Sequence, residues 1–172
     1  ESDLLEMNEM DDRLSFSIRF YNIVTSMSLL VNPQMIPFFA CRMVQLTMEN
    51  GLCEHSILSF VQFAAMLCSS KIAKKSIERA SQIGKAAMSC SRKWYNTATQ
   101  LPNLYLNYYG LIAFHTEPLQ TCADMHRQGF DTGMSLGESG TAFFNAIRHI
   151  RTAVIAGDRL PTLLEKVDYK EQ

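Results

Sequence analysis

Apolar side chains recur at three- and four-residue steps through most of the chain, which is the spacing of one face of an α-helix. The first such stretch runs from Asp12 to Val31, where Asp11 or Asp12 can cap the free N–H groups and Asn32-Pro33 ends the helix. The chain is therefore expected to begin its folded part with a long helix. The positions expected to face inward are Leu14, Ile18, Tyr21, Thr25, Ser28 and Leu29.

The same spacing predicts further helices joined by short breaks. Gly51, Gly137 and Gly157 each follow such a stretch and can supply the left-handed residue that ends a helix. The pattern therefore predicts an all-α fold of about eight helices. After residues 12–31, the expected helices are 33–50, 54–69, 71–91, one that begins near Leu101, 118–136, 138–156 and 160–169.

Short connections make successive helices antiparallel, so the chain is expected to form helical hairpins that close into a bundle or stack into a superhelix. Ala80, Gly84 and Ala87 have the small-residue steps of the second helix of a tetratricopeptide unit, although the full signature of its first helix is absent. These steps favour stacked antiparallel hairpins, an α-solenoid segment. The expected domain division is an acidic N-terminal extension at 1–11 and one helical-repeat-like domain at 12–172. Other small residues expected where helices approach each other are Ala64, Ala65, Gly133, Ala142 and Ala146.

Composition limits the class of protein. Of the 172 residues, 47% are hydrophobic and 19% are charged, which excludes a disordered tail, and 8 Gly and 5 Pro are too few for a many-stranded sandwich. A net charge of -1 gives no global field toward nucleic acid, so nucleic acid is not expected as a partner. The most apolar stretch, 20–31, is interrupted by polar residues and is shorter than the ~20 residues that cross a bilayer, so no membrane span is expected.

The cysteines indicate a reducing compartment. There are 5 of them, an odd number, spread along the chain without a C-x-x-C pair, so they form neither a disulfide framework nor a zinc framework. Residues 1–12 contain six acids and no base, unlike a secretory signal. We therefore expect a cytoplasmic protein, and the absence of Met at position 1 suggests that this chain was cut from something longer. The cysteines are Cys41, Cys53, Cys68, Cys90 and Cys122.

Several stretches, taken in order, carry a family resemblance. They are 29–33, 42–47 with Asn50-Gly51, 59–65, Gly129-x3-Gly133 and 157–160. From about Asp12 to Val167 the chain thereby resembles the tetratricopeptide-like helical region of very large signalling proteins. In that family the region follows a STAND-type AAA ATPase module and is joined to a serine/threonine kinase-like domain, a histidine kinase or a nucleotide cyclase. The family's ATPase and kinase residues have no counterpart here, so the resemblance implies scaffolding or sensing rather than turnover.

The sequence lacks the motifs of common catalytic and cofactor sites. A phosphate-binding loop needs Ser or Thr after Gly-Lys, but Gly84-Lys85 is followed by Ala86. The four histidines show no pair at one helical turn, and Cys53-x-His55 supplies only half a metal site. We therefore expect no cofactor, no metal and no enzymatic activity in this segment.

Two groups of side chains are candidates for partner binding. Residues 71–93 hold seven bases against one acid, Glu78; a solvated helix face is the favoured interpretation, and binding of phosphates or an acidic partner is the alternative. The aromatic group around the fifth helix is expected to pack between hairpins, with a concave peptide-binding surface as the alternative. The candidate residues are Lys71, Lys74, Lys75, Arg79, Trp94, Tyr105 and Tyr109.

The leading functional hypothesis is a non-catalytic helical scaffold or regulatory segment of a larger signal-transduction protein. It would bind protein partners or adjacent domains of the same chain. The alternative is a small helical enzyme or ligand-binding bundle with a pocket near Tyr105, Tyr109, His115 and His126.

Overall fold

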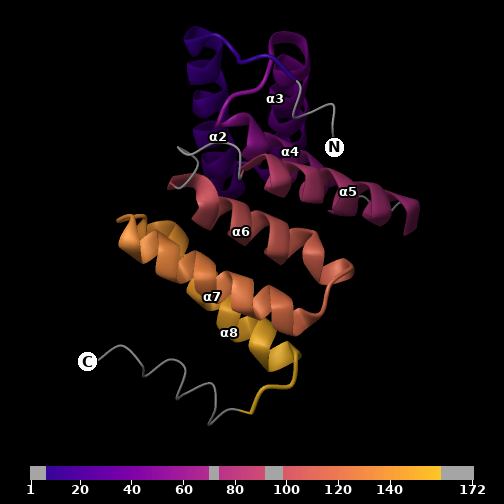
Figure 1. The fold of residues 1–172 in the computed structure, drawn as a ribbon, viewed down its shortest axis with the longest axis vertical. Coiled ribbons are helices and arrows are strands. Elements are labelled where there is room, and N and C mark those ends of the chain that lie inside the picture. Colours follow the sequence, from indigo (N-terminus) through magenta and orange to yellow (C-terminus); the bar gives the residue numbers. More distant parts are fainter. Residues whose placement is uncertain (1–6, 70–73, 92–98, 160–172) are drawn as a thin grey trace. The chain divides into compact units, whose positions relative to one another are not determined.

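The computed structural model describes residues 7–69, 74–91 and 99–159, and the regular elements in these ranges are helices (Figure 1). The all-α fold class is therefore confirmed. Within the described ranges there are seven α-helices, and the helix expected at 160–169 lies outside them. The α-helices are α2 (Asp12–Val31), α3 (Ile36–Asn50), α4 (Ser56–Ser69), α5 (Lys74–Ser91), α6 (Leu101–Leu111), α7 (Leu119–Ser135) and α8 (Ser139–Ile155), with 3-10 turns η1 (Pro33–Met35) and η3 (Ala113–His115).

Contacts divide the chain into two compact units. Unit 1 is Glu1–Gln100 and contains α2 to α5; unit 2 is Leu101–Gln172 and contains α6 to α8. The single domain expected at 12–172 and the stacking of hairpins into a solenoid stay predictions.

The helix ends follow the expected turn chemistry with one exception. Gly51, Gly137 and Gly157 have φ of 105°, 77° and 93°, the left-handed region that favours glycine. Asp11 does occupy the N-cap of α2, but its side chain makes no capping hydrogen bond. Instead its backbone carbonyl accepts the N–H groups of Leu14 and Ser15 at 3.0 and 2.9 Å. The predicted side-chain cap at Asp11 is therefore wrong: the Leu14 N–H, which such a cap would bond, donates to the Asp11 carbonyl instead.

Unit 1 is built from helices that pack in chain order, α2 on α3, α3 on α4 and α4 on α5. Buried Met10, Ile18, Met43 and Cys53 form one apolar cluster of this unit. Met10 belongs to the segment expected to be an acidic extension, 1–11, of which residues 1–6 lie outside the described ranges. Part of this segment thus contributes to the core of unit 1. Partly buried Leu14, Tyr21 and Leu46 pack around the cluster.

Two backbone hydrogen bonds attach this N-terminal segment to the loop after α3. The Met10 N–H donates to the Leu52 carbonyl at 3.1 Å, and the Leu52 N–H donates to the Asn8 carbonyl at 2.8 Å. A Cβ added at Gly51 would lie 2.4 Å from the Asn8 carbonyl oxygen. Glycine is therefore required at position 51 both by its φ and by this close approach.

In the described part of unit 2, residues 101–159, α6, α7 and α8 pack together, and α7 and α8 form the most extensive contact. Glycines of α7 set their separation. A Cβ at Gly133 would lie 2.9 Å from the Ala142 Cβ, and a Cβ at Gly129 would lie 2.7 Å from the Asn145 Oδ1 atom. The helices therefore approach at small residues, as expected for Gly133 and Ala142.

Within the described ranges, every helix is too short or too polar to cross a bilayer.

Candidate functional site

The outward side of α2 carries a continuous row of large apolar side chains. Their exposed fractions range from 51% at Ile23 to 85% at Val31. At 100° per residue these positions fall within one narrow arc of the helix. Exposed apolar side chains that form one contiguous row mark interaction sites more often than isolated ones do. We call this row the α2 apolar face; it consists of Phe16, Phe20, Ile23, Met27 and Val31.

The opposite, inward side of α2 buries polar side chains. Asn22, Thr25 and Ser28 are all buried, although they lie among the positions that face the core of unit 1. The Thr25 and Ser28 hydroxyls donate to carbonyls one turn earlier in the same helix, at 2.7 and 2.8 Å. Because these bonds are made within the helix, burying the hydroxyls leaves no donor unsatisfied. Thus α2 buries three polar side chains together with Ile18, and it exposes both of its Phe side chains.

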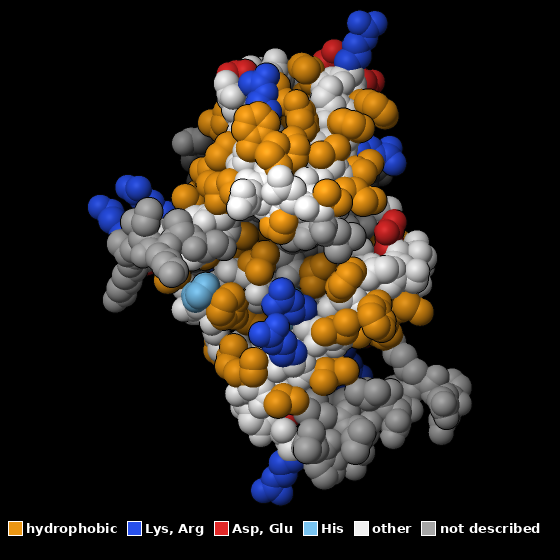
Figure 2. Space-filling view, turned by 180° about the vertical axis from the view of Figure 1, so that it is seen from behind, with side chains coloured by type: hydrophobic (Ala, Val, Ile, Leu, Met, Phe, Trp, Pro, Cys, Tyr) orange, Lys and Arg blue, Asp and Glu red, His pale blue; other side chains and the backbone are white. Residues whose placement is uncertain are grey.

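Further exposed apolar side chains lie on the adjoining elements of unit 1. Met35 in η1 and Phe38 in α3 are exposed, and the Phe38 ring makes an edge contact with the Phe39 ring at 5.6 Å between centroids. Figure 2 shows hydrophobic side chains gathered over the upper part of the view, where Figure 1 places α2 and α3. This side of unit 1 is therefore largely apolar.

In unit 2, α8 shows the same inverted distribution. Its buried positions hold small or polar residues, including Asn145 and His149, while its exposed positions hold Phe and branched aliphatic residues. Their exposed fractions run from 40% at Ile150 to 63% at Phe143. We call this row the α8 apolar face; it consists of Phe143, Ile147, Ile150 and Val154.

A polar network fills the space that the small residues of α7 and α8 leave. The Asn145 Nδ2 group donates to the carbonyls of Pro102 and Thr141, at 2.9 and 3.1 Å, which fixes the orientation of the amide. The Asn145 Oδ1 atom must then accept, so the His126 Nδ1 atom, 3.1 Å away, carries the proton. His126 is thereby assigned its Nδ1–H tautomer, with Nε2 as an acceptor.

The Nε2 atom of His126 is buried and has no hydrogen-bond partner in the described part of the chain. Burial lowers the pKa of His126 below 6.5, and the nearby Arg148 and His149 lower it further, while the bond to Asn145 opposes the shift. On α6, a Cβ at Gly110 would lie 3.5 Å from the His126 ring and 3.6 Å from the Arg148 Nε atom. A neutral imidazole is therefore held in the interior of unit 2.

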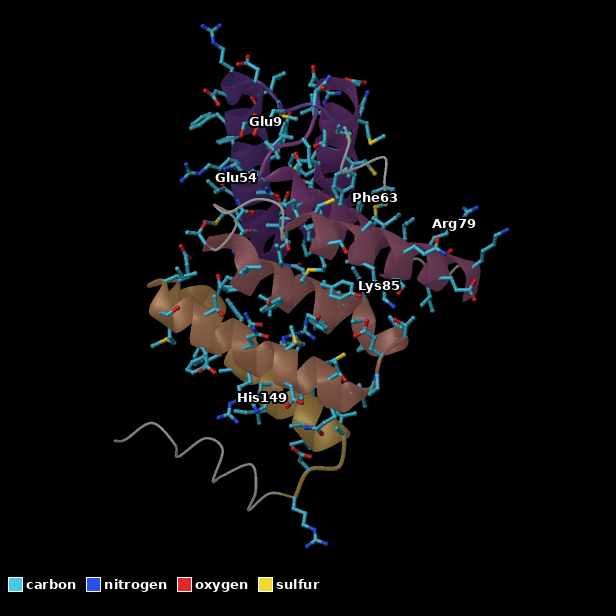
Figure 3. The ribbon with its side chains drawn as sticks, in the orientation of Figure 1. Glu9, Glu54, Phe63, Arg79, Lys85 and His149 are labelled. Atoms are coloured by element: carbon cyan, nitrogen blue, oxygen red, sulfur yellow. The ribbon has the colours of Figure 1, made fainter. Side chains whose placement is uncertain are left out.

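His149 is the second buried histidine, and Figure 3 labels it on α8. Its Nδ1 atom donates to the Ala123 carbonyl at 2.8 Å, because a carbonyl can only accept. The two histidines therefore both hold α7 to α8 through Nδ1–H donors. Their role in the structure is to connect helices.

A second polar group of unit 2 joins α6 to the start of α7. The Tyr108 hydroxyl donates to the Glu117 carboxylate at 3.2 Å. Burial raises the pKa of the Cys122 thiol to about 11, and the nearby Glu117 adds to the shift. The pKa of Tyr108 is raised by the same two causes. The Cys122 thiol is therefore protonated at neutral pH, which makes it a poor nucleophile.

Of the basic residues proposed for partner binding, two are described with their side chains. Lys75 and Arg79 are exposed on α5, and Figure 3 shows Arg79 extending from that helix. Lys74 begins α5, but its side chain is not described, and Lys71 lies outside the described residues. Arg79 and Lys75 are thus accessible to solvent, in agreement with a solvated helix face.

The aromatic candidates divide between surface and interior. Trp94 lies outside the described residues. The half-buried rings of Tyr105 and Tyr109 make an edge contact at 5.8 Å between centroids, one turn apart on α6. His115 is exposed in η3, where its ring lies 3.9 Å from the Phe114 ring, whereas His126 is fully buried against Asn145. The four residues of the expected pocket therefore belong to unit 2 but have different environments.

Cys53 and His55, which supply only half a metal site in the sequence, lie in a hydrogen-bonded turn before α4. The Cys53 Sγ atom lies 3.2 Å from the Ser56 Oγ atom. The His55 Nε2 atom lies 3.2 Å from the Glu54 carboxylate, and its Nδ1 atom contacts the Gln100 side chain. Burial lowers the pKa of His55, an effect that the Glu54 carboxylate opposes. Among the described residues, no group of three or more His, Cys, Asp or Glu side chains could hold a metal ion.

Comparison of the chain with protein-family models, with curated proteins and with solved structures gives no match. The tetratricopeptide-like resemblance therefore stays a prediction. Sequence reasoning assigned the inward face of α2 correctly at Ile18, Thr25 and Ser28 but did not identify the opposite row. The signal was present as a second apolar periodicity at 16, 20, 23 and 27 within the same helix.

Proposed function

We propose that this chain is a non-catalytic helical interaction module, a scaffold or regulatory segment that binds protein partners or adjacent domains of a larger signalling protein. The observation that supports this proposal is the α2 apolar face, which lies opposite the side by which α2 packs into unit 1. The α8 apolar face gives unit 2 a surface of the same kind.

Covering these exposed apolar side chains with a partner would release the free energy of burying them. Full burial of a Phe, Ile, Met or Val side chain contributes roughly 1.5 to 3 kcal/mol relative to exposure. On α2 the five large side chains contribute about half of this or less to the folded unit, since each is at least 51% exposed. A partner that covers this row recovers that free energy, so the surface is suited to binding other polypeptide rather than water.

In unit 2, the buried histidine and cysteine side chains that could act in catalysis are engaged in packing and hydrogen bonds, which supports a structural role for them. His126 and His149 each use Nδ1–H in a bond between α7 and α8, and the Cys122 thiol is held protonated. Of the described basic candidates, Lys75 and Arg79 lie on an exposed helix face. We therefore assign contact formation, rather than turnover, to this chain.

Site-specific photo-crosslinking tests the proposal. A photoreactive residue is placed at Phe20 on the α2 apolar face, or at Ile147 on the α8 apolar face, in the complete gene product in its own cells. Matched controls place it at Ser26 and Arg151, which are exposed on the same two helices outside these rows.

We expect discrete adducts from Phe20 and Ile147, mapped by mass spectrometry to defined polypeptide segments, at several-fold higher yield than from Ser26 and Arg151. Equal, diffuse labelling from the face and control positions would overturn the proposal. So would a catalytic activity of the isolated chain that a single substitution abolishes.

A further inference from the structure

The exposed row on α2 has the spacing of a helix-pairing seam. Phe16, Phe20, Ile23 and Met27 follow each other at steps of four, three and four residues, and Val31 adds a further step of four. Alternating steps of three and four form the seam along which two helices pack as knobs into holes. The α2 apolar face is therefore suited to a helical partner.

We propose that the partner of the α2 apolar face is α2 of a second copy of this chain, aligned antiparallel about a two-fold axis near Ile23. The inference rests on the proposed function and identifies one of its partners. It follows from three properties of α2: the order of side-chain sizes, the distribution of charge and the exposed area.

The order of side chains is complementary to itself when one copy is reversed. An antiparallel alignment centred between positions 23 and 24 sets Phe16 opposite Val31 and Phe20 opposite Met27. Each aromatic ring then meets a smaller or flexible side chain, and contact between a Met sulfur and an aromatic ring is favourable. Isologous two-fold contacts require such self-complementarity.

The charges of α2 favour the same orientation. Its charged residues, Asp12, Arg13 and Arg19, all lie in its first half, whereas residues 20–31 contain no charged side chain. An antiparallel pair places these charges beside the uncharged half of the other copy. A parallel pair would place Arg19 beside Arg19, which is repulsive because no acidic residue of α2 lies within one turn of it.

The α8 apolar face is less suited to pairing with itself. The exposed Arg151 lies near this face and α8 contains no acidic residue, whereas Arg148 is directed toward Gly110 of α6. Two copies of α8 would therefore bring like charges together along one contact. This difference in charge assigns self-association to α2.

The area of the α2 apolar face sets the strength of the contact. An aromatic or large aliphatic side chain that is more than half exposed contributes on the order of 100 Å². The five residues of the face thus bury roughly 1,000 Å² over both copies, at the lower limit for a specific interface. We therefore expect a dimer that forms reversibly with concentration rather than an obligate one.

Sedimentation equilibrium of the full chain tests the pairing. Wild type is compared with Ile23→Asp and Met27→Asp on the seam, and with Ser26→Asp, which adds the same charge to the same helix outside the face. We expect wild type to form dimers, the two seam variants to raise the dimer Kd by at least about 100-fold, and Ser26→Asp to change it by less than about threefold. Circular dichroism establishes that each variant is folded.

Disulfide formation tests the orientation. In a Cys41→Ser background, Ile23→Cys is expected to link two copies, because the two-fold axis brings these positions together. Phe16→Cys is expected not to link, because its two copies lie about 22 Å apart along the antiparallel helices. Efficient linkage of Phe16→Cys would overturn the antiparallel pairing.

A wild-type chain that stays monomeric up to hundreds of micromolar, or dimers that persist in folded Ile23→Asp, would overturn the self-association. A monomeric chain that still gives discrete photo-adducts from Phe20 to a different polypeptide would overturn this inference while supporting the proposed function. Failure of both experiments would overturn both.

Discussion

Asn145 is the residue on which the packing of unit 2 depends most. Its amide bonds the Pro102 and Thr141 carbonyls, its oxygen accepts from His126, and its side chain fills the space above Gly129. A buried network of this kind stabilises only when each polar group has its partner. Substitutions that move Asn145 are therefore expected to have large effects.

Gly129→Ala tests this close approach. The added Cβ would lie 2.7 Å from the Asn145 Oδ1 atom, so we expect unit 2 to lose about 1 to 3 kcal/mol of unfolding free energy despite the higher helix propensity of Ala. Gly140→Ala on α8, where a Cβ meets nothing within 4 Å, is the matched control and should be neutral or slightly stabilising. Urea denaturation measures both; equal effects would contradict the assignment.

The buried imidazole of His126 predicts how stability depends on pH. Burial lowers its pKa below 6.5 in the folded state, so the unfolded state binds the proton more readily. The contribution of the neutral His126 imidazole to the free energy of unfolding is fully present above pH 6.5, and it is lost as the pH falls from 6.5 toward the pKa of the folded state. The slope of this loss is at most about 1.4 kcal/mol per pH unit.

The measurement is the unfolding free energy of unit 2 between pH 8 and pH 5, from hydrogen exchange of its amides. His126→Gln should reduce this slope, while the difference between the two proteins at pH 8 gives the cost of the substitution itself. A slope that is unchanged in His126→Gln would exclude His126 as its origin.

At the scale of elements, α2 departs from the usual amphipathic pattern, because it buries polar side chains on one side and exposes a row of large apolar ones on the other. Its boundaries follow from Pro33 and from the apolar spacing, and both ends were predicted correctly. Its inward face was also predictable, because Ile18 and Thr25 lie on a different side of the helix from the charged Arg13 and Arg19.

The outward face of α2 could not be separated from the core by periodicity alone. Two apolar rows on opposite sides of one helix give no single direction in which the core must lie. Only packing distinguishes them: α3 and α4 cover the side that holds Thr25 and Ser28. The network around Asn145 was likewise beyond sequence reasoning, because its partners Pro102 and His126 lie on different helices.

Two isoleucines of α2 separate the packed side from the exposed side. Ile18 is fully buried, so Ile18→Ala is expected to cost about 2 to 5 kcal/mol of unfolding free energy. Ile23 is 51% exposed, so Ile23→Ala should change it by no more than about 0.5 kcal/mol in dilute solution. Thermal denaturation at low protein concentration compares the two. A loss at Ile23 as large as that at Ile18 would place Ile23 in the core.

At the scale of the whole chain, the two units share one design. In each, one helix buries small or polar residues, such as Ser28 in α2 and Ala142 in α8, and presents a row of large apolar side chains outward, although α2 also buries Ile18. The all-α class was predictable because helical spacing extends along nearly the whole chain. The division at Gln100 was not predicted, since the sequence between α5 and α6 resembles the other short breaks.

The central claim is that the α2 apolar face is covered when the protein acts. Oxidative footprinting of methionine in the complete gene product measures this coverage, because oxidation of Met follows its accessibility. Met27 lies on the face and is 60% exposed, Met134 on α7 is 53% exposed outside both rows, and Met43 is fully buried. In the isolated chain at low concentration, Met27 and Met134 should oxidise rapidly and Met43 slowly.

Inside the cell, we predict that the oxidation rate of Met27 falls to nearly that of Met43. Met134, which lies outside the α2 apolar face, should stay readily oxidised and serves as the exposed reference. Met27 that oxidises as fast in the cell as in the dilute isolated chain would contradict the account.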